Sequence, residues 1–235
     1  MLAAVRVAAI VVAAGRGERF GQSLPKAFVS LAGRPLLLHA VEVLSAVATV
    51  SCVQPVVARE ELQRFEALLR GAGPLPKLAP AVAGGAERQD SVRAGLAALP
   101  ADCELVAVHD AARALVRPGA VARTIELAAR EGAAILAVPV RDTIKRVVDG
   151  RIVETPERAS CWAAQTPQVF RIELLREAHA KAAADGLQGT DDAELVERLG
   201  VTVHVVEGDA DNLKLTHPQD LALAERILAQ RSGEA

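Results

Sequence analysis

The sequence predicts an α/β fold with a mostly parallel sheet flanked by helices. Short runs rich in β-branched residues alternate along the chain with longer Ala- and Leu-rich segments of helical period. The predicted strands are continuously apolar, which is typical of parallel strands covered by helices on both faces. The chain has 235 residues, of which 51% are hydrophobic, and this is enough for one domain with a substantial core.

The strands are expected in six apolar runs. The first of these runs is followed directly by a Gly-rich turn, and its apolar stretch from Val7 to Ala14 is short. Both features favour a buried strand over a signal peptide or a membrane span. The predicted strands are Val5–Val12, Val50–Ala58, Leu78–Ala83, Glu104–His109, Ala133–Val138 and Thr202–Glu207.

The helices are expected between and after these strands. Pro118 and Pro218 suit the first turn of a helix, where a missing N–H costs nothing. The predicted helices are Pro35–Val47, Glu60–Gly71, Gln89–Leu99, Pro118–Glu131, Ile172–Ala184, Asp191–Leu199 and Pro218–Gln230. No internal repeat, low-complexity tract or linker divides the chain, so residues 1–235 are expected to form a single domain.

One segment departs from this alternation. Thr143–Glu154 reads TIKRVVDGRIVE, in which two β-prone arms surround Asp149-Gly150, a favoured pair for a tight hairpin turn. The sheet does not need this hairpin, so we expect a protruding arm over about residues 141–158 that clasps a partner subunit. A surface hairpin without a partner is the alternative.

Composition excludes several classes of protein. The 27 basic and 29 acidic residues give a net charge of −2, which does not support nucleic-acid binding through a basic face. Aromatic residues make up 2% of the chain, which argues against stacking platforms. Three widely spaced cysteines, Cys52, Cys103 and Cys161, fit neither zinc spacing nor a disulfide framework, and indicate reduced thiols in a cytoplasmic protein.

A glycine-rich loop follows the first predicted strand and reads AAGRGERFGQSLPKAF. Phe20 stands where a dinucleotide fingerprint and a P-loop would both need glycine. What remains is a GxGxR pattern with Lys26 seven residues after Arg19. Glycines let backbone N–H groups approach phosphates, and two cations beside them suit a triphosphate. A Gly-rich turn with solvated charges is the alternative.

Further motifs follow the loop in order. They are GGAERQDSV (Gly84–Val92), VHDAAR (Val108–Arg113), VPVRDTIKRV (Val138–Val147), AQTPQVF (Ala164–Phe170), GTDDAELVE (Gly189–Glu197) and EGDADNLKLTHPQDLALAE (Glu207–Glu225). With the AAGxGxR…PK loop they resemble the 2-C-methyl-D-erythritol 4-phosphate cytidylyltransferase family of the sugar-phosphate nucleotidyltransferases. The resemblance extends from Val11 to Glu225 and implies a Rossmann-like nucleotidyltransferase domain.

The reaction that the resemblance implies joins methylerythritol phosphate to CTP, with Mg²⁺, and releases pyrophosphate. A phosphate monoester has a second pKa of about 6, so the nucleophile is already mostly dianionic at neutral pH and needs no general base. The obstacle is charge repulsion, which cations and Mg²⁺ must suppress.

The resemblance also assigns site residues. It implies that Arg19 and Lys26 hold the triphosphate, and that Arg158 and Lys214 position the acceptor phosphate. Nucleotide contacts fall on Ala13, Ala14, Gly15, Gly17, Gly85 and Ser91. Substrate contacts fall on Asp110, Arg113, Thr143, Thr166 and Thr190, with Thr143 reaching across a homodimer interface and Asp110 a possible metal ligand.

Purely structural roles are the alternative for several of these residues. Ser91 and Thr190 could cap helices, and Asp110 could form an internal pair with Arg113. His109 is expected to pack beneath its strand rather than act as an acid or base. Ala114 stands where the family usually has proline, which loosens the backbone after Arg113.

Three other functions compete with this interpretation. A cytidylyltransferase for another polyol phosphate, such as ribitol 5-phosphate, would share the loop and the cytidine pocket. An NAD-dependent oxidoreductase is disfavoured by the missing glycine and by the absence of an acid at the end of the second strand. A non-catalytic nucleotide sensor is disfavoured because every expected cation is present.

Overall fold

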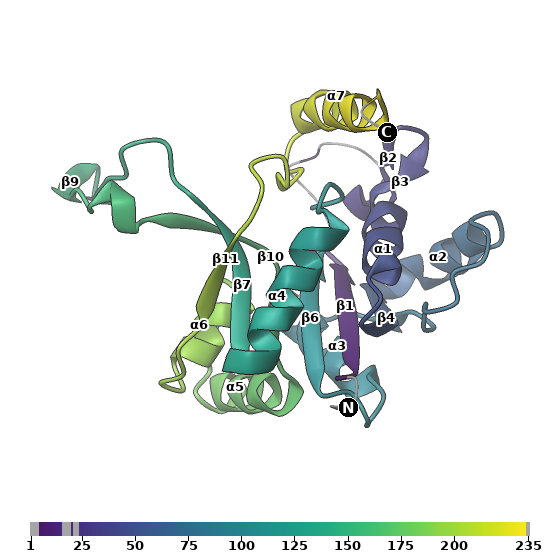
Figure 1. Cartoon of the computed structure of the whole chain (residues 1–235), viewed down its shortest axis with the longest axis horizontal. Coiled ribbons are helices and arrows are strands. Elements are labelled where there is room, and N and C mark those ends of the chain that lie inside the picture. The colour runs from purple at the N-terminus through teal and green to yellow at the C-terminus, as the bar shows by residue number, and fades with distance from the viewer. Residues whose placement is uncertain (1–4, 16–19, 21–23, 234–235) are drawn as a thin grey trace.

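The computed structural model describes residues 5–15, 20 and 24–233, and within them a central seven-stranded sheet carries the fold (Figure 1). The strand order is β11-β7-β10-β6-β1-β4-β5, and β10 is antiparallel to both of its neighbours while the other pairs are parallel. The strands are β1 (Val7–Ala13), β4 (Val50–Val57), β5 (Val82–Ala83), β6 (Leu105–Asp110), β7 (Ala133–Pro139), β10 (Trp162–Arg171) and β11 (His204–Glu207). The expected mostly parallel sheet is confirmed.

Helices lie where the periodicity predicts them. They are α1 (Leu36–Ala46), α2 (Leu62–Leu69), α3 (Arg88–Ala98), α4 (Pro118–Glu131), α5 (Ile172–Ala184), α6 (Asp192–Glu197) and α7 (Gln219–Gly233). Pro118 is the first residue of α4, and Pro218 directly precedes α7. Short 3-10 turns in the described part of the chain include η2 (Lys26–Phe28), η3 (Arg59–Glu61) and η4 (Arg158–Ser160).

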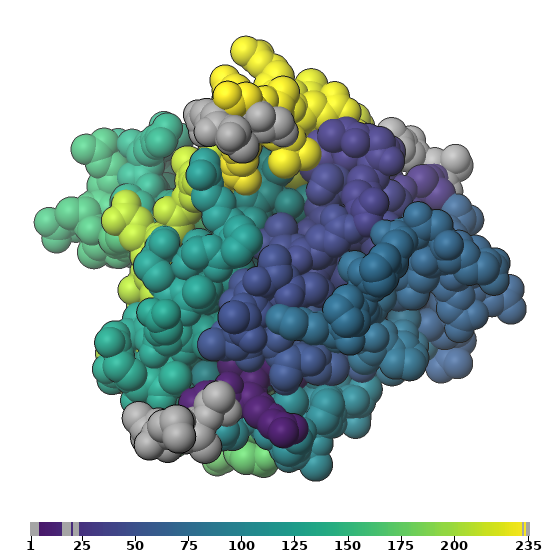
Figure 2. All heavy atoms as spheres, turned by 45° about the vertical axis from the view of Figure 1, so that its right-hand side comes forward, coloured from purple at the N-terminus to yellow at the C-terminus, as the bar shows by residue number. Residues whose placement is uncertain are grey.

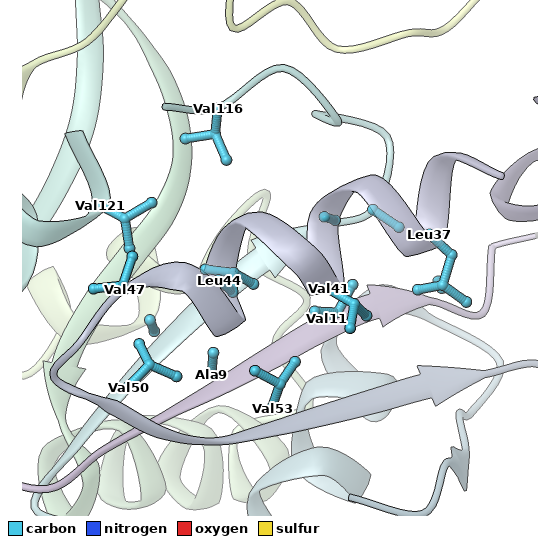
Figure 3. Packing of buried hydrophobic residues seen from close by; sticks show 14 of the residues in the cluster. Ala9, Val11, Leu37, Val41, Leu44, Val47, Val50, Val53, Val116 and Val121 are labelled. Carbon is cyan, nitrogen blue, oxygen red and sulfur yellow. The ribbon is translucent and has the colours of Figure 1, made fainter. Parts of the chain in front are cut away.

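Two hydrophobic cores lie on opposite faces of the sheet, because successive side chains of a strand point to opposite sides. Val7, Ala9 and Val11 of β1 join the core that α1 and α4 cover (Figure 3). Ala8 and Ile10 join the core that α3, α5 and α6 cover. Burial on both faces accounts for the continuous apolar character of the strand.

The sequence did not reveal strand β10. Its centre carries Gln165, Thr166, Pro167 and Gln168, which interrupt the apolar run, and its pairing with β7 shifts register between Ala164 and Gln168. The predicted strand Leu78–Ala83 is shorter than expected, with a bridge from Leu78 to Val53 and pairing of Val82–Ala83 with β4. Pro80 lies between these two contacts and has no N–H to donate. The small ribbon of β2 (Ser30–Leu31) and β3 (Arg34–Pro35) was also not predicted.

The predicted hairpin is present as β8 (Arg146–Val148) and β9 (Arg151–Glu154), and it projects from the body of the molecule (Figures 1 and 2). Asp149 and Gly150 have φ of 48° and 75°, as a tight hairpin turn requires. Every residue from 141 to 155 is exposed. We call residues 141–158 the arm.

A third hydrophobic cluster joins α7 to the segments beside the carboxyl ends of the strands. Leu31, Leu36, Leu115 and Leu215 are fully or almost fully buried there, and Ile227 of α7 packs with them. Leu215 therefore anchors the loop that carries the neighbouring Lys214. Among residues 5–15, 20 and 24–233, no helix combines the length and the apolar character that a membrane crossing requires.

Candidate active site

A cavity of about 310 Å³ opens at the carboxyl ends of β1 and β6. Ligands in α/β folds bind at this edge of the sheet, because the loops that leave parallel strands meet there. The cavity brings together eight of the predicted site residues, which are Ala13, Ala14, Gly15, Lys26, Gly85, Ser91, Asp110 and Lys214. Glu87 and Arg88, which were not predicted, line it as well.

Gly85 lines the cavity, and both Gly85 and the preceding Gly84 pack closely against neighbouring side chains. A Cβ atom on Gly84 would lie 2.4 Å from the Cβ of Ala14, and one on Gly85 would lie 2.3 Å from the Cβ of Asp90. Glycine is therefore required at both positions by packing. Among the described residues, no side chain covers the main chain of Gly85 at the cavity, which suits the close approach of a flat ring or a phosphate.

Ser91 lies beside these glycines, but its hydroxyl is engaged within the protein. The Oγ accepts from the N–H of Gly85 at 3.2 Å and donates to the carbonyl of Glu87 at 3.1 Å. The N-cap of α3 is Glu87, which forms a capping box with Asp90, so the alternative of a Ser91 cap is not what the structure shows. Ser91 therefore holds the backbone of Gly85 and Glu87 in place through its hydroxyl.

Asp110 is the buried carboxylate of the cavity. Its Oδ1 accepts from Nε of Arg88 at 3.0 Å and its Oδ2 from Nζ of Lys214 at 2.7 Å. Burial alone would raise the pKa of Asp110, but the two cations hold that pKa well below its usual range. Asp110 is ionised at neutral pH and fixes the ammonium of Lys214 at the cavity.

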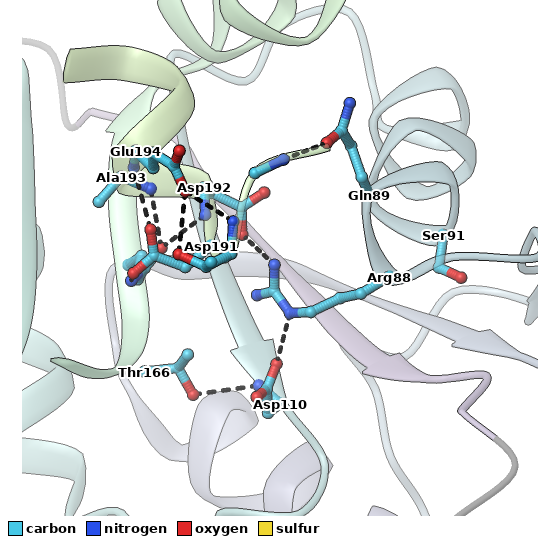
Figure 4. Close-up of polar contacts among 12 residues, drawn as sticks. Arg88, Gln89, Ser91, Asp110, Thr166, Asp191, Asp192, Ala193 and Glu194 are labelled. Atoms are coloured by element: carbon cyan, nitrogen blue, oxygen red, sulfur yellow. Dashed lines mark hydrogen bonds and ion pairs between the residues drawn. The ribbon is translucent and has the colours of Figure 1, made fainter. Parts of the chain in front are cut away.

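Arg88 also reaches away from the cavity. Its Nη1 donates to Oδ2 of Asp192 at 2.8 Å, so the guanidinium lies between two carboxylates (Figure 4). Burial would lower the pKa of Arg88, but Asp192 and Asp110 together raise it above its usual value. Both Arg88 and Asp192 fall inside sequence blocks that carry the family resemblance, and that was the available signal. Their pairing joins positions 104 residues apart, so no local pattern could reveal it.

Thr166 and His109 support Asp110 from beneath. Nε2 of His109 lies 3.2 Å from the carbonyl of Arg113, which can only accept, so Nε2 carries the proton. Burial lowers the pKa of His109 to about 4, so the ring is neutral and Nδ1 is an acceptor. The Thr166 hydroxyl therefore donates to Nδ1 at 3.0 Å, and its oxygen accepts from the N–H of Asp110 at 3.1 Å.

Arg113 ties the Lys214 loop to the sheet. Its Nη1 donates to the carbonyl of Asn212 at 2.7 Å and its Nη2 to the carbonyl of Ala164 in β10 at 3.1 Å. The side-chain amide of Asn212 donates to Thr166 and to Gln165 in the same strand. Asp110 makes its ion pairs with Arg88 and Lys214, so the alternative of an internal Asp110–Arg113 pair is not what the structure shows.

The remaining predicted residues lie elsewhere. Thr143 and Arg158 are exposed on the arm, where Arg158 donates to the carbonyl of Arg141 at 3.3 Å. Thr190 is exposed and donates through its N–H and its hydroxyl to Glu194, while Asp191 is the N-cap of α6. These three do not line the cavity. Gly17 and Arg19 fall outside the described residues.

The described part of the chain contains no group of three His, Cys, Asp or Glu side chains that could hold a metal ion. Mg²⁺ commonly binds through one or two carboxylates together with substrate phosphates. Asp110 and Glu87 are the carboxylates at the cavity, and both oxygens of Asp110 are paired with cations. The donor set therefore fits a metal that the nucleotide phosphates carry, with Asp110 beside it.

Comparisons with known proteins identify the family of the chain. The sequence model described as 2-C-methyl-D-erythritol 4-phosphate cytidylyltransferase matches residues 7–230. A curated protein of that name from Alkaliphilus metalliredigens is 44% identical over 232 residues, covering 98% of this chain and 96% of the relative.

Solved structures of proteins with this function share the fold. A 4-diphosphocytidyl-2C-methyl-D-erythritol synthase from Anaerococcus prevotii is similar with a TM-score of 0.86 at 27% identity, over 96% of this chain and 97% of that one. A 2-C-methyl-D-erythritol 4-phosphate cytidylyltransferase from Thermus thermophilus is similar with a TM-score of 0.74 at 41% identity, over 95% and 98% of the two chains. The chain belongs to the 2-C-methyl-D-erythritol 4-phosphate cytidylyltransferase family.

Proposed function

We propose that the protein transfers the cytidylyl group of CTP to 2-C-methyl-D-erythritol 4-phosphate and releases pyrophosphate. Family membership supports the reaction, and one observation at the site carries it. Lys26 and Lys214, from opposite ends of the chain, line the same cavity beside the main chain of Gly85. That combination suits a nucleoside triphosphate that meets a second anion.

The chemistry follows from charge. An oxygen of the acceptor phosphate attacks the α-phosphorus of CTP, and the bond from that phosphorus to the bridging oxygen of the β-phosphate breaks, so pyrophosphate leaves with the electron pair. The attacking phosphate is already mostly dianionic, because its second pKa is about 6. His109 is buried and neutral with both ring nitrogens engaged, so it is not a proton acceptor for this step.

The protein's own groups then act by holding and neutralising phosphates. Lys26 and Arg19 are the proposed contacts of the triphosphate, and Ala13, Ala14, Gly15, Gly85 and Ser91 line the cavity as the proposed nucleotide contacts. Arg19 and Gly17, a further predicted nucleotide contact, lie outside the described residues. Lys214 contacts the reacting phosphates from its position on Asp110. These cations stabilise the negative charge that develops in the transition state.

The acceptor side uses Asp110 and the residues around it. Asp110 is the proposed acceptor contact at the cavity, with Thr190 as a further predicted contact. Arg113 and Thr166 support it indirectly, since their polar groups bind the Lys214 loop and Asp110. Asp110 would lie beside a Mg²⁺ ion carried by the CTP phosphates, and that ion would supply additional neutralising charge.

The arm implies a homodimer. Thr143 and Arg158 belong to the predicted site but lie on the arm, outside the cavity of their own subunit. The arm also exposes Val147, Val148, Ile152 and Val153, and contiguous exposed apolar side chains usually mark an interaction surface. A second copy of the chain that covers this surface would bring the arm residues to a neighbouring cavity.

The cytoplasm is the proposed location. Cys52, Cys103 and Cys161 are all unpaired in the structure, and unpaired cysteines are typical of proteins in reducing compartments.

Turnover tests this proposal. Purified protein is incubated with CTP, Mg²⁺ and either methylerythritol phosphate or ribitol 5-phosphate, and pyrophosphate release is measured. We expect turnover with methylerythritol phosphate. Turnover with ribitol 5-phosphate alone would mean that ribitol 5-phosphate, not methylerythritol phosphate, is the acceptor. Stabilisation against heat by NAD but not by CTP–Mg²⁺ would instead favour the oxidoreductase.

Lys26→Ala tests the assigned role of the cavity lysine. The variant should lose about a hundredfold or more in kcat/KM, because charge stabilisation by one group at a transition state has that size. Lys181→Ala is the matched control, since Lys181 is exposed on α5 and pairs with Asp185 at 3.2 Å. Equal losses in both variants would contradict the role of Lys26.

A further inference from the structure

A series of charged side chains, each paired with the next, leads from the cavity into the protein interior at α6 and α5. Lys214 pairs with Asp110 at 2.7 Å, Asp110 with Arg88 at 3.0 Å, and Arg88 with Asp192 at 2.8 Å. Asp192 in turn meets Nε2 of His179 at 3.0 Å. Figure 4 shows Arg88 extended between the two carboxylates. The first three members line the cavity and the last two do not.

Asp192 is held firmly from behind. Its side chain is 1% exposed, and its Oδ1 meets His179 of α5. The N–H groups of Asp192 and Ala193 both donate to Oε1 of Gln168 in β10 at 3.1 Å. His179 thus fixes the carboxylate, Gln168 fixes the backbone that carries it, and Asp192 does not line the cavity.

Arg88 transmits this position because its guanidinium is a rigid planar fork. Nε donates to Asp110 and Nη1 donates to Asp192, so the two hydrogen bonds fix the plane and the position of the guanidinium. A lysine ammonium at the same place is a compact charge on a flexible stem, and it has no planar fork with which to hold both carboxylates in one orientation.

The position of the Lys214 ammonium depends on its pairing with Asp110. Its side chain is 44% exposed, and the carboxylate of Asp110 is the side-chain partner that the described residues give its ammonium. The orientation of that carboxylate therefore determines where the ammonium lies over the cavity.

We propose that Asp192 and Arg88 are positioning residues for the transfer reaction: Asp192 holds Arg88, Arg88 orients Asp110, and Asp110 places the ammonium of Lys214 at the reacting phosphates. This inference rests on the proposed function and adds to it a residue outside the cavity. It predicts that a substitution in α6 alters turnover although it touches no substrate.

The direction of the effect separates positioning from bulk charge. Asp192→Asn removes a negative charge near an anionic substrate, so a purely electrostatic effect would tighten CTP binding. Loss of position instead lowers kcat, because a displacement of about 1 Å at a reacting group costs about a hundredfold. We expect kcat to fall about tenfold to a hundredfold, with KM for CTP unchanged or lower.

Arg88→Lys is the companion variant, since it keeps the charge and loses the fork. It should lose kcat to a similar extent, whereas an arginine that acted only as a charge on the phosphates would be replaced well by lysine. Asp185→Asn and Arg93→Lys are matched controls on exposed ion pairs of α5 and α3, and they should keep wild-type kcat. If Asp192→Asn does not fold, Arg88→Lys carries the same test.

A double-mutant cycle shows whether Asp192 acts through Lys214. If it does, Asp192→Asn combined with Lys214→Met should be about as slow as Lys214→Met alone. Losses that multiply, or a wild-type kcat in Arg88→Lys, would overturn the proposal.

A readout without turnover keeps this test separate from the proposed function. The chain has five lysines, so after reductive methylation with ¹³C their methyl signals are few enough to assign by substitution. The Lys214 signal should shift in Asp192→Asn and Arg88→Lys but not in the controls. If wild type lacks turnover while the signal shifts, the proposed function fails and the positioning chain stands as structure. If wild type turns over and neither variant changes kcat or the signal, the inference alone fails.

Discussion

At the scale of single residues, the site concentrates cations that the composition hides. The net charge of the chain is −2, yet Lys26, Arg88 and Lys214 line one cavity with the carboxylates Glu87 and Asp110. The chain has 22 arginines and five lysines, and two of those lysines are at this cavity. Lysine presents a compact ammonium where arginine presents a broad fork, so each suits a different position in the site.

His109 makes the stability of the protein sensitive to acid. Its folded-state pKa is lowered to about 4 by burial, while an unfolded histidine titrates near 6.5. As pH falls below that value the unfolded chain takes up the proton first, so the free energy of unfolding decreases. The histidine should contribute a loss of about 2 kcal/mol between pH 7 and pH 5.

Urea unfolding of wild type and His109→Gln at both pH values measures this loss. The variant should be less stable at pH 7, because it disturbs the contact with Thr166, but its stability should change less with pH. His217→Gln, at an exposed position, is the control and should follow wild type. The lowered pKa of Asp110 acts in the same direction at lower pH and is common to all three proteins. An unchanged pH slope in His109→Gln would contradict a neutral buried His109.

Sequence reasoning located most cavity residues but not how their polar groups are used. Ala13, Lys26, Asp110 and Lys214 follow motif positions, and the cavity contains them. The hydroxyls of Ser91 and Thr166 are engaged within the protein: Ser91 bonds to Gly85 and Glu87 in its own loop, whereas Thr166 meets the N–H of Asp110, which tertiary folding brings near. The use of the Thr166 hydroxyl depends on a neighbour 56 residues away and leaves no local pattern.

At the scale of elements, Gly95 sets how closely α3 approaches the sheet. A Cβ atom there would lie 2.8 Å from Cγ2 of Ile10 and 3.1 Å from Cγ2 of Val56. Gly95→Ala should therefore destabilise the protein by about 1–3 kcal/mol, because these buried neighbours cannot move without strain in the core.

The control for this prediction is Gly119→Ala in α4, where the new methyl would lie 3.9 Å from Nη1 of Arg123, an ordinary van der Waals contact. It should stabilise the protein by about 0.5–1 kcal/mol, since alanine loses less backbone entropy than glycine in a helix. Denaturant midpoints of both variants test the pair. A neutral or stabilising Gly95→Ala would mean that α3 is free to shift away from β1.

Elements with strong local patterns were predictable and those with mixed patterns were not. Asp149-Gly150 requires positive φ, and the structure has it at both positions, so the hairpin followed from two residues. Strand β10 is central and buried, yet its polar centre pairs with groups from β6, α6 and the Lys214 loop. Those partners lie far along the chain, so the segment looks like a loop when taken alone.

At the scale of the whole molecule, the arm has little to stabilise it against the body of its own subunit. Ile152 is 63% exposed and the neighbouring valines are about half exposed. Ile152→Asp should leave the unfolding midpoint of the body nearly unchanged and convert the proposed homodimer to a monomer. Sedimentation equilibrium measures the mass, with Leu223→Asp, at an exposed apolar position of α7, as the control. A monomeric wild-type protein with full turnover would contradict the dimer.

The two groups of site residues make a sharper test possible, because cavity and arm can be disabled in separate subunits. Two variants are purified separately and then mixed. One carries Lys214→Met and the other carries Thr143→Val with Arg158→Met, and each alone should have little turnover.

If the arm contributes to the cavity of the neighbouring subunit, subunit exchange creates heterodimers with one complete site. In that site, the intact Lys214 of one subunit meets the intact arm of the other. Random exchange places about half of the chains in such dimers, so about a quarter of wild-type activity should return. If each arm serves its own cavity, no combination restores a complete site and the mixture stays inactive. The result therefore decides between subunits, independently of how strongly the dimer associates, provided that mass measurements show exchange.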